Sequence, residues 1–219
     1  MTSLSTTVLI TGASSGIGRE FAHIFAKKGY NLILVARRRD LLEDIKTEYK
    51  NIHIEIIEKD LSVSGSVGEL YEAVQAKNLQ VDILINNAGF GDFGYFHEGD
   101  IQKYREMIQL NITALTELCY MFGKEMISRN NGKILNVAST AAFQPGPLMS
   151  VYFATKHYVL AFSEGIAEEW SQYGVVVTAL CPGPTESGFQ VGARATQNKM
   201  FTKKLPSSSE VAEYGYSAL

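Results

Sequence analysis

Residues 6–18 read Thr-Thr-Val-Leu-Ile-Thr-Gly-Ala-Ser-Ser-Gly-Ile-Gly, so that a β-branched run leads directly into a glycine-rich turn. The first six of these residues are typical of a short buried strand. The glycines allow a tight turn, a close approach of the backbone to a ligand and close packing of the helix that follows. The N-terminus of that helix presents unpaired N–H groups to an anion, which favours a diphosphate site.

This turn supplies the first candidate cofactor-binding residues, which are Gly12, Ser14, Ser15, Gly16, Ile17 and Gly18. Their spacing is G-x-x-x-G-x-G instead of G-x-G-x-x-G, and a purely structural turn is the alternative interpretation of this segment taken alone. A strand before the turn and a helix after it are the context that nucleotide binding requires, and the sequence predicts both.

Short β-branched runs and longer stretches of helical period alternate along the rest of the chain, which is typical of repeated βαβ units. Strands are predicted at 6–11, 31–36, 52–58, 81–86, 133–138 and 175–181. Helices are predicted at 16–28, 40–50, 66–77, 101–129 and 150–172. We therefore expect one α/β domain over residues 1–219, a doubly wound Rossmann sheet of about six parallel strands between two helical layers.

From Pro182 the helical and strand periods are lost, because Gly, Pro, Ser, Thr and Lys are frequent. Such a composition favours a mobile substrate loop over residues 186–208. Ser207 to Glu210 are suited to cap a short final helix, after which the chain stops at Leu219 without another strand.

Composition and charge exclude several classes of protein. The 219 residues are 46% hydrophobic and carry a net charge of −3, without a basic block that could follow a phosphate backbone. Nucleic acid is therefore not an expected partner. No signal peptide or membrane span is expected either, since no apolar run approaches the roughly 18 residues that cross a bilayer. Cys119 and Cys181 lie in apolar surroundings and indicate free thiols in a reducing cytoplasm.

Three arginines, Arg37, Arg38 and Arg39, follow the second predicted strand. A site for NAD has an acid at this strand end, where it binds the 2′-hydroxyl of the adenosine ribose. Guanidinium groups instead bind a 2′-phosphate through charge-assisted hydrogen bonds. The sequence thus favours NADP(H), with Arg37 and Arg38 as candidate contacts. The alternative is a solvated basic face, which best describes Arg39 and also suits Arg38.

Tyr152 and Lys156 are four residues apart in a predicted helix and therefore share one face. Moving a tyrosine pKa from near 10 to about 7 requires roughly 4 kcal/mol of preferential stabilisation of the phenolate. A neighbouring ammonium in a dehydrated site supplies much of this energy. Y-x-x-x-K alone usually means an exposed helix pair. Ser139, however, directly follows a predicted strand, at the sheet edge where open α/β folds bind ligands.

Together these motifs resemble those of the short-chain dehydrogenase/reductase family, in its Rossmann-type form with an Asn-Ser-Tyr-Lys active site. The resemblance covers about residues 6–190, and residues 144–149 look like the branch with ketoacyl-type and hydroxysteroid-type reductases. The segments that carry it are Thr11–Gly18, Asp60-Leu61, Asn86–Gly89, Asn111, Ser139, Tyr152–Lys156 and Cys181–Thr185.

The resemblance implies a role for each catalytic candidate. Tyr152 would be the general acid that protonates a carbonyl oxygen, or the base in the reverse direction, and Ser139 would hydrogen-bond the same oxygen. Lys156 would bind the nicotinamide ribose and lower the pKa of Tyr152, while Asn111 would hold a water that carries protons to Lys156. Hydride comes from the cofactor, so no metal is expected.

The resemblance also extends the cofactor site and frames the substrate pocket. Besides the turn, Tyr152 and Lys156, it implies contacts from Arg37, Arg38, Asp60, Leu61, Asn87, Ala88, Gly89, Pro182, Gly183 and Thr185. We expect an apolar pocket wall made of Phe90, Phe93, Tyr95, Phe96, Phe143, Leu148, Met149 and Phe189. Such a lining suits a small apolar carbonyl compound or alcohol.

The expected activity is NADP(H)-dependent carbonyl reduction or alcohol oxidation of the short-chain type. One alternative is a nucleotide-binding sensor or scaffold that has kept the fold without turnover. Another is an epimerase or dehydratase, although those relatives have a larger C-terminal substrate region. The helices predicted at 101–129 and 150–172 match those through which family members pair, so a homodimer or tetramer is expected. The usual seventh strand of the family is not seen before Leu219.

Overall fold

The computed structural model describes residues 6–189, 193 and 205–219. Its strands form one parallel sheet with the order β3-β2-β1-β4-β5-β6. They are β1 (Thr7–Thr11), β2 (Asn31–Ala36), β3 (Ile54–Glu58), β4 (Ile83–Asn86), β5 (Gly132–Val137) and β6 (Val175–Leu180). Each strand ends within two residues of its predicted bounds, and the predicted α/β Rossmann fold is confirmed.

The helices alternate with these strands along the chain. They are α1 (Gly16–Lys27), α2 (Arg39–Glu48), α3 (Ser66–Ala76), α4 (Ile101–Ile108), α5 (Leu115–Ser128), α6 (Ser150–Ser171) and α8 (Ser208–Ser217). The predicted cap of the final helix is present: Ser207 Oγ accepts a hydrogen bond from Glu210 N, and the Glu210 carboxylate accepts one from Ser207 N. These two bonds satisfy backbone N–H groups at the start of α8.

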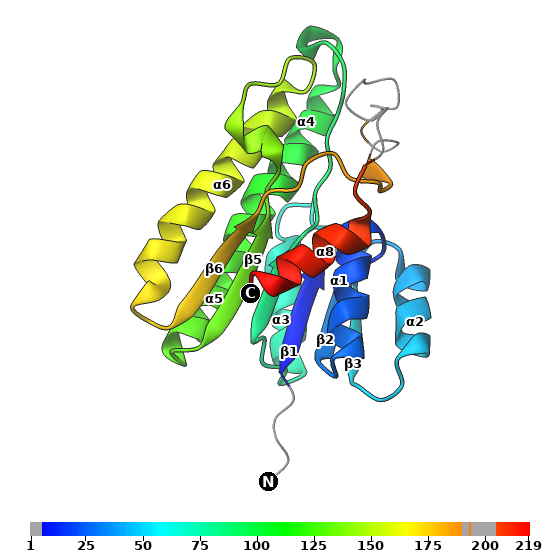
Figure 1. The fold of residues 1–219 in the computed structure, drawn as a ribbon, viewed down its shortest axis with the longest axis vertical. Helices are drawn as coiled ribbons and strands as arrows, with labels where there is room; N and C mark the ends of the chain where they lie inside the picture. The colour runs from blue at the N-terminus through cyan, green and yellow to red at the C-terminus, as the bar shows by residue number, and fades with distance from the viewer. Residues whose placement is uncertain (1–5, 190–192, 194–204) are drawn as a thin grey trace.

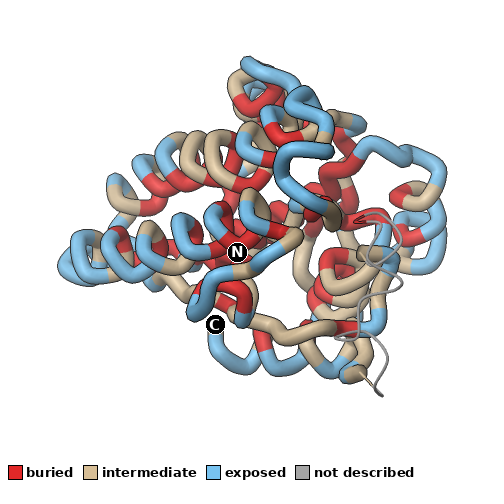
Figure 2. Tube along the Cα trace, turned by 90° about the horizontal axis from the view of Figure 1, so that it is seen from above, coloured by how far each residue is buried: buried red, intermediate tan, exposed pale blue. Residues whose placement is uncertain are grey.

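Helices cover both faces of the sheet (Figure 1). Successive side chains of a strand point to opposite faces, so Val8 and Ile10 of β1 pack in the core beneath α1, α2 and α8. Leu9, between them, packs in the other core, beneath α3, α5 and α6. Seen from above, the buried residues follow the strands and the inner sides of the helices (Figure 2). Two separate apolar cores therefore hold one rigid sheet between them.

The prediction of one helix over 101–129 is wrong in one respect, because a π-helical segment, Gln109–Ala114, separates α4 from α5. Asn111 lies in this segment and is buried. Its side chain hydrogen-bonds the backbone of Phe90 in the loop after β4, at 2.9 and 3.2 Å. A single wider turn of this kind is commonly found at functional sites. The bonds to Phe90 hold the wide turn against that loop.

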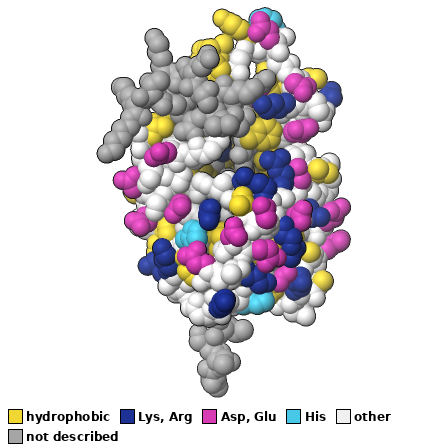
Figure 3. Space-filling view, turned by 90° about the vertical axis from the view of Figure 1, so that its right-hand side faces the viewer, with side chains coloured by type: hydrophobic (Ala, Val, Ile, Leu, Met, Phe, Trp, Pro, Cys, Tyr) yellow, Lys and Arg dark blue, Asp and Glu magenta, His cyan; other side chains and the backbone are white. Residues whose placement is uncertain are grey.

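Most of the loop predicted at 186–208 lies outside the described residues, at 190–192 and 194–204. Its two described ends lie side by side, since Glu186 N donates to Pro206 O at 2.9 Å. In the part of the chain that is described, no helix is long and apolar enough to span a bilayer. On the face that carries α2, Lys and Arg side chains are interspersed with Asp and Glu (Figure 3).

The strand order determines where at the sheet edge a ligand can bind. The chain adds β2 and β3 on one side of β1 and then returns to add β4 on the other side. The loops that leave the carboxyl ends of β1 and β4 therefore diverge, and open α/β sheets bind ligands in the crevice between such loops.

Candidate active site

A cavity of about 550 Å³ opens at this crevice. It is lined by nearly all of the predicted site residues, namely Gly12, Ser14, Ser15, Gly16, Ile17, Arg37, Arg38, Asp60, Leu61, Asn87, Ala88, Gly89, Ser139, Tyr152, Lys156, Pro182, Gly183 and Thr185. Two predicted site residues, Gly18 and Asn111, are not in its lining. The cavity thus joins the glycine-rich turn at one end to the Ser139, Tyr152 and Lys156 side chains at the other.

The glycine-rich turn depends on space that only glycine leaves. Gly12 has a φ of +66°, and a Cβ at this position would lie 2.8 Å from Asn87 Nδ2. A Cβ on Gly18 would lie 2.3 Å from the same atom. Asn87 Nδ2 itself donates to Thr11 O at 3.0 Å and to Gly12 O at 3.3 Å. The absence of a side chain at Gly18 therefore lets α1 pack closely against the turn, and its contact with a cofactor stays a prediction.

The two candidate arginines lie in different places. Arg38 Nη2 donates to Ser14 Oγ at 3.1 Å and to Ser15 Oγ at 3.0 Å, so it lies against the turn. Arg37 has an exposed fraction of 74%, and its Nη1 is 3.7 Å from a carboxylate oxygen of Asp60. Burial raises the pKa of Asp60, but hydrogen bonds from Ser62 and the charge of Arg37 outweigh it and hold that pKa below its usual range.

Both arginines line the cavity, and so does Lys59, which sequence reasoning missed. Arg39, in contrast, pairs with Glu43 on α2 at 2.9 Å and is not in the lining. The interpretation of Arg39 as part of a solvated basic face fits this position. The cationic end of the cavity is therefore built by Arg37, Arg38 and Lys59.

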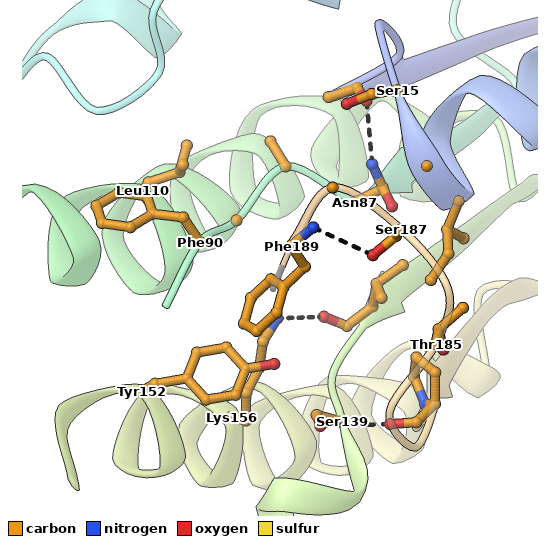
Figure 4. A pocket seen from close by; sticks show the side chains of 18 of the residues that line it. Ser15, Asn87, Phe90, Leu110, Ser139, Tyr152, Lys156, Thr185, Ser187 and Phe189 are labelled. Carbon is orange, nitrogen blue, oxygen red and sulfur yellow. Dashed lines mark hydrogen bonds between the residues drawn. The ribbon is translucent and has the colours of Figure 1, made fainter. Parts of the chain in front are cut away.

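Tyr152 and Lys156 lie side by side on α6, and Ser139 follows β5 (Figure 4). Lys156 Nζ donates to Val137 O at 2.7 Å and lies 5.8 Å from the centre of the Tyr152 ring. Ser139 Oγ donates to Pro182 O at 3.3 Å and accepts from Ala141 N at 3.1 Å. The sheet edge and the first turns of α6 thus hold all three side chains at one end of the cavity.

Burial sets the proton affinities of this pair. It raises the pKa of Tyr152 to about 12, although a hydrogen bond with Ser139 acts in the opposite direction. It lowers the pKa of Lys156 to about 8, with a smaller opposing effect from the nearby Cys181 thiol. The lowering of the Tyr152 pKa by Lys156 that the resemblance implies is not seen. The Lys156 ammonium binds the Val137 carbonyl, and burial has the largest effect on the pKa of Tyr152.

Asn111 lies behind the cavity wall and ties two elements together. Its Nδ2 donates to Phe90 O and, at 3.1 Å, to Thr155 Oγ1. Thr155 Oγ1 donates in turn to Tyr152 O at 2.7 Å. The side chain of Asn111 therefore positions the turn of α6 that carries Tyr152. Sequence reasoning missed Thr155, although its place directly before Lys156 was a usable signal.

The predicted aromatic wall is only partly correct. Phe90, Met149 and Phe189 line the cavity, and Phe93 packs on the same apolar cluster. Tyr95, Phe96 and Phe143 are instead more than half exposed, and neither they nor Leu148 line the cavity. Gly94 has a φ of +152°, and Phe96 after it stacks on Tyr104 of α4. The lining also contains Gln144, Phe153 and Ser187, which are not part of the predicted apolar set.

A family model described as short chain dehydrogenase matches residues 6–198. The chain belongs to the short-chain dehydrogenase family. Among curated members, it is 39% identical over 182 residues to the very-long-chain 3-oxoacyl-CoA reductase-like protein of Arabidopsis thaliana, covering 80% of this chain and 58% of that protein. It is 33% identical over 183 residues to human 17-beta-hydroxysteroid dehydrogenase type 3, covering 80% and 57%. The chain thus spans less than two thirds of the length of these short-chain dehydrogenases.

Solved structures of the family agree with the fold. The short-chain dehydrogenase of Sphingobium yanoikuyae in complex with NADPH has a TM-score of 0.88 at 31% identity, covering 97% of this chain and 85% of that one. A short-chain dehydrogenase/reductase of Burkholderia phymatum in complex with NAD has a TM-score of 0.87 at 25% identity, covering 98% and 85%. The predicted membership of the short-chain dehydrogenase family is confirmed.

Proposed function

We propose that this protein transfers hydride between NADP(H) and a neutral, apolar ketone or secondary alcohol. The observation that carries the proposal is the single continuous cavity, which has Ser14, Ser15 and Arg38 at one end and Tyr152 and Lys156 at the other. A nucleotide bound along it would bring its nicotinamide to the tyrosine.

The residues present fit a dinucleotide phosphate. Gly12 and Gly16 carry no side chain, so a ligand can approach the backbone of the turn closely. The first turn of α1 contains no acidic residue, and its free N–H groups suit an anion. Arg38, Ser14 and Ser15 form a polar pocket that suits a 2′-phosphate. The similar protein that binds NADPH supports this choice, while the one that binds NAD makes a direct test necessary.

Proton transfer would be the task of Tyr152. Because burial holds its pKa at about 12, the hydroxyl stays protonated near neutral pH and can donate to a carbonyl oxygen. Ser139 would donate a second hydrogen bond to the same oxygen. Lys156, with a pKa of about 8, would bind ribose hydroxyls and exchange protons near the working pH. Bound nicotinamide would supply the hydride.

The charges of the cavity favour a neutral substrate. Four of the charged lining residues, Arg37, Arg38, Lys59 and Asp60, follow β2 or β3 at the nucleotide end. Among the described lining residues, only Lys156 is charged at the Tyr152 end. Met149, Phe153 and Phe189 surround that end instead. A carboxylate or phosphate beside the carbonyl would lose its hydration there, and Lys156, the charged residue at this end, already donates to Val137 O and would bind the ribose.

A panel of carbonyl compounds, read by the loss of NADPH absorbance, tests this proposal. We expect turnover of butane-2,3-dione and of uncharged aliphatic or aryl ketones, and at least about tenfold lower kcat/KM for 2-oxo acids of similar size. If NADPH binds but no carbonyl compound is reduced, the proposal is wrong, and the result favours a nucleotide-binding sensor or scaffold. Equal rates with charged and neutral substrates would remove the argument for an apolar one.

Cofactor choice has its own variant. Replacing Arg37 and Arg38 together with alanine is expected to weaken NADPH binding by roughly a hundredfold, since each lost charge-assisted bond costs about 1.5 kcal/mol. NADH binding should change only slightly. The matched control is Arg39→Ala, because Arg39 pairs with Glu43 outside the cavity. Dissociation constants from the quenching of protein fluorescence decide the point, and equal weakening of both nucleotides would contradict NADP(H) preference.

The homodimer and the cytoplasmic location stay predictions. The exposed apolar side chains that a dimer through α4, α5 and α6 would cover are Ile101, Ile108, Tyr120 and Tyr158.

A further inference from the structure

Phe189 rests on the ring of the candidate general acid. The centres of the Phe189 and Tyr152 rings are 5.2 Å apart, at an interplanar angle of 51°. Figure 4 shows the Phe189 ring above Tyr152 and beside Lys156, on the segment that follows β6. Phe189 N donates to Ser187 Oγ at 3.3 Å, and Phe189 O accepts from Ala193 N at 2.8 Å. The backbone N–H and C=O groups of Phe189 are therefore both hydrogen-bonded.

The space for this ring exists because residue 91 is a glycine. A Cβ on Gly91 would lie 2.8 Å from Phe189 Cζ, 3.1 Å from Tyr152 Cδ2 and 3.2 Å from Met149 Cε. Gly91 is not among the glycines with a positive φ, so alanine would meet no conformational strain at this position. The first of these distances is too short for any Cβ. A side chain at residue 91 would thus act on Phe189 through direct contact.

The distance between the rings excludes a third group. Apolar atoms in contact are about 3.5 to 4.0 Å apart, so even a flat group between two rings needs their centres about 7 Å apart. At 5.2 Å there is no such space. A ketone bound at the Tyr152 hydroxyl therefore cannot place a substituent over the Tyr152 ring unless the Phe189 ring moves. A flat substituent requires a small movement of the ring, while a tetrahedral, branched one is about twice as thick and requires a large one.

We infer that Phe189 selects substrates by the bulk of the group beside the carbonyl, and that Gly91 provides the space in which it does so. The inference rests on the proposed function and narrows its substrate class. Favoured substrates are neutral ketones that carry a small or planar group on the carbonyl carbon, such as α-diketones and aryl ketones. Ketones with a quaternary carbon at that position are disfavoured by Phe189.

Two symmetric α-diketones test the inference. Butane-2,3-dione carries a methyl group on each carbonyl carbon, and 2,2,5,5-tetramethylhexane-3,4-dione carries a tert-butyl group on each. In Phe189→Ala we expect the ratio of kcat/KM for the branched over the unbranched diketone to rise at least about tenfold above that of the unmodified protein. Phe143→Ala is the control, since Phe143 is exposed and does not line the cavity, and its ratio should not move.

The contact between residues 91 and 189 is tested by coupling. Gly91→Ala alone should change the same ratio by displacing the ring, and it should have a much smaller effect when Phe189 is already alanine. Additive effects of the two substitutions, or a Phe189→Ala ratio equal to that of the unmodified protein, would overturn the inference while leaving the proposed function intact. If the unmodified protein reduces neither diketone, nor any other carbonyl compound, the proposed function and this inference fail together.

Discussion

Tyr152→Phe is expected to lower the rate of NADPH oxidation with butane-2,3-dione by about a thousandfold, because a positioned general acid contributes roughly 10²- to 10⁴-fold. The substitution removes only the hydroxyl. The ring can keep its contacts with Phe153 and Phe189, and the nucleotide end of the cavity is unaffected. NADPH affinity should therefore stay within about threefold, a change of well under 1 kcal/mol. Steady-state kinetics and a binding titration measure the two quantities separately.

The matched control for this variant is Tyr158→Phe. Tyr158 lies on the same helix, but its hydroxyl contacts Thr116 Oγ1 at 2.9 Å, and it does not line the cavity. Its loss should leave the rate close to that of the unmodified protein. Retention of a tenth or more of the rate in Tyr152→Phe would remove Tyr152 from the role of general acid, whatever the control shows.

Lys156→Met is expected to stabilise the cofactor-free protein while it abolishes turnover. Burial lowers the pKa of Lys156 from 10.5 to about 8, and a difference of this size corresponds to roughly 3 kcal/mol of lost stability when the lysine is protonated. Methionine is similar in length and needs no hydration. The Val137 carbonyl loses its hydrogen bond, which offsets about 1 kcal/mol. We expect a net gain of roughly 2 kcal/mol in the free energy of unfolding at pH 7.

The dependence of the free energy of unfolding on pH distinguishes the removal of a buried charge from an improvement in packing. Between pH 8 and 10.5 the unfolded chain binds a proton at Lys156 that the folded protein has already lost, so the stability of the unmodified protein rises with pH in this window. The methionine variant lacks that rise. Urea denaturation at pH 7 and pH 9.5 measures it, with exposed Lys124→Met as the control. No gain at pH 7, or the same pH dependence in both proteins, would contradict the buried-charge explanation.

The strands and the position of the site were predictable from sequence because their signals are local. A buried parallel strand is a short, continuous apolar run, and the ends of such runs fix where polar side chains leave the sheet. Ser139 after β5 and the turn after β1 follow directly from this rule. Tyr152 and Lys156 required only the helical period. These residues therefore meet in the cavity as predicted.

The sequence-based predictions were wrong where contacts between distant residues determine the local structure. Asn111 in the π-helical segment hydrogen-bonds Phe90, 21 residues away, and no local pattern shows such a contact. Tyr95 and Phe96 are exposed, and Phe96 stacks on Tyr104 of α4, whereas their aromatic character alone suggested that they line the cavity. Neighbouring arginines at a strand end also look equivalent in sequence. In the structure, Arg38 bonds the glycine-rich turn, whereas Arg37 is exposed and lies near Asp60.

The position of β1 at the centre of the sheet makes the glycine-rich turn dependent on a remote part of the chain. Thr7 N hydrogen-bonds Asp82, 75 residues away, and the Asn87 side chain closes the turn itself. A fragment that ends before β4 would contain the whole glycine motif, yet it would lack one wall of the crevice. The motif is therefore not a transferable module: its ability to hold a nucleotide is a property of the assembled sheet.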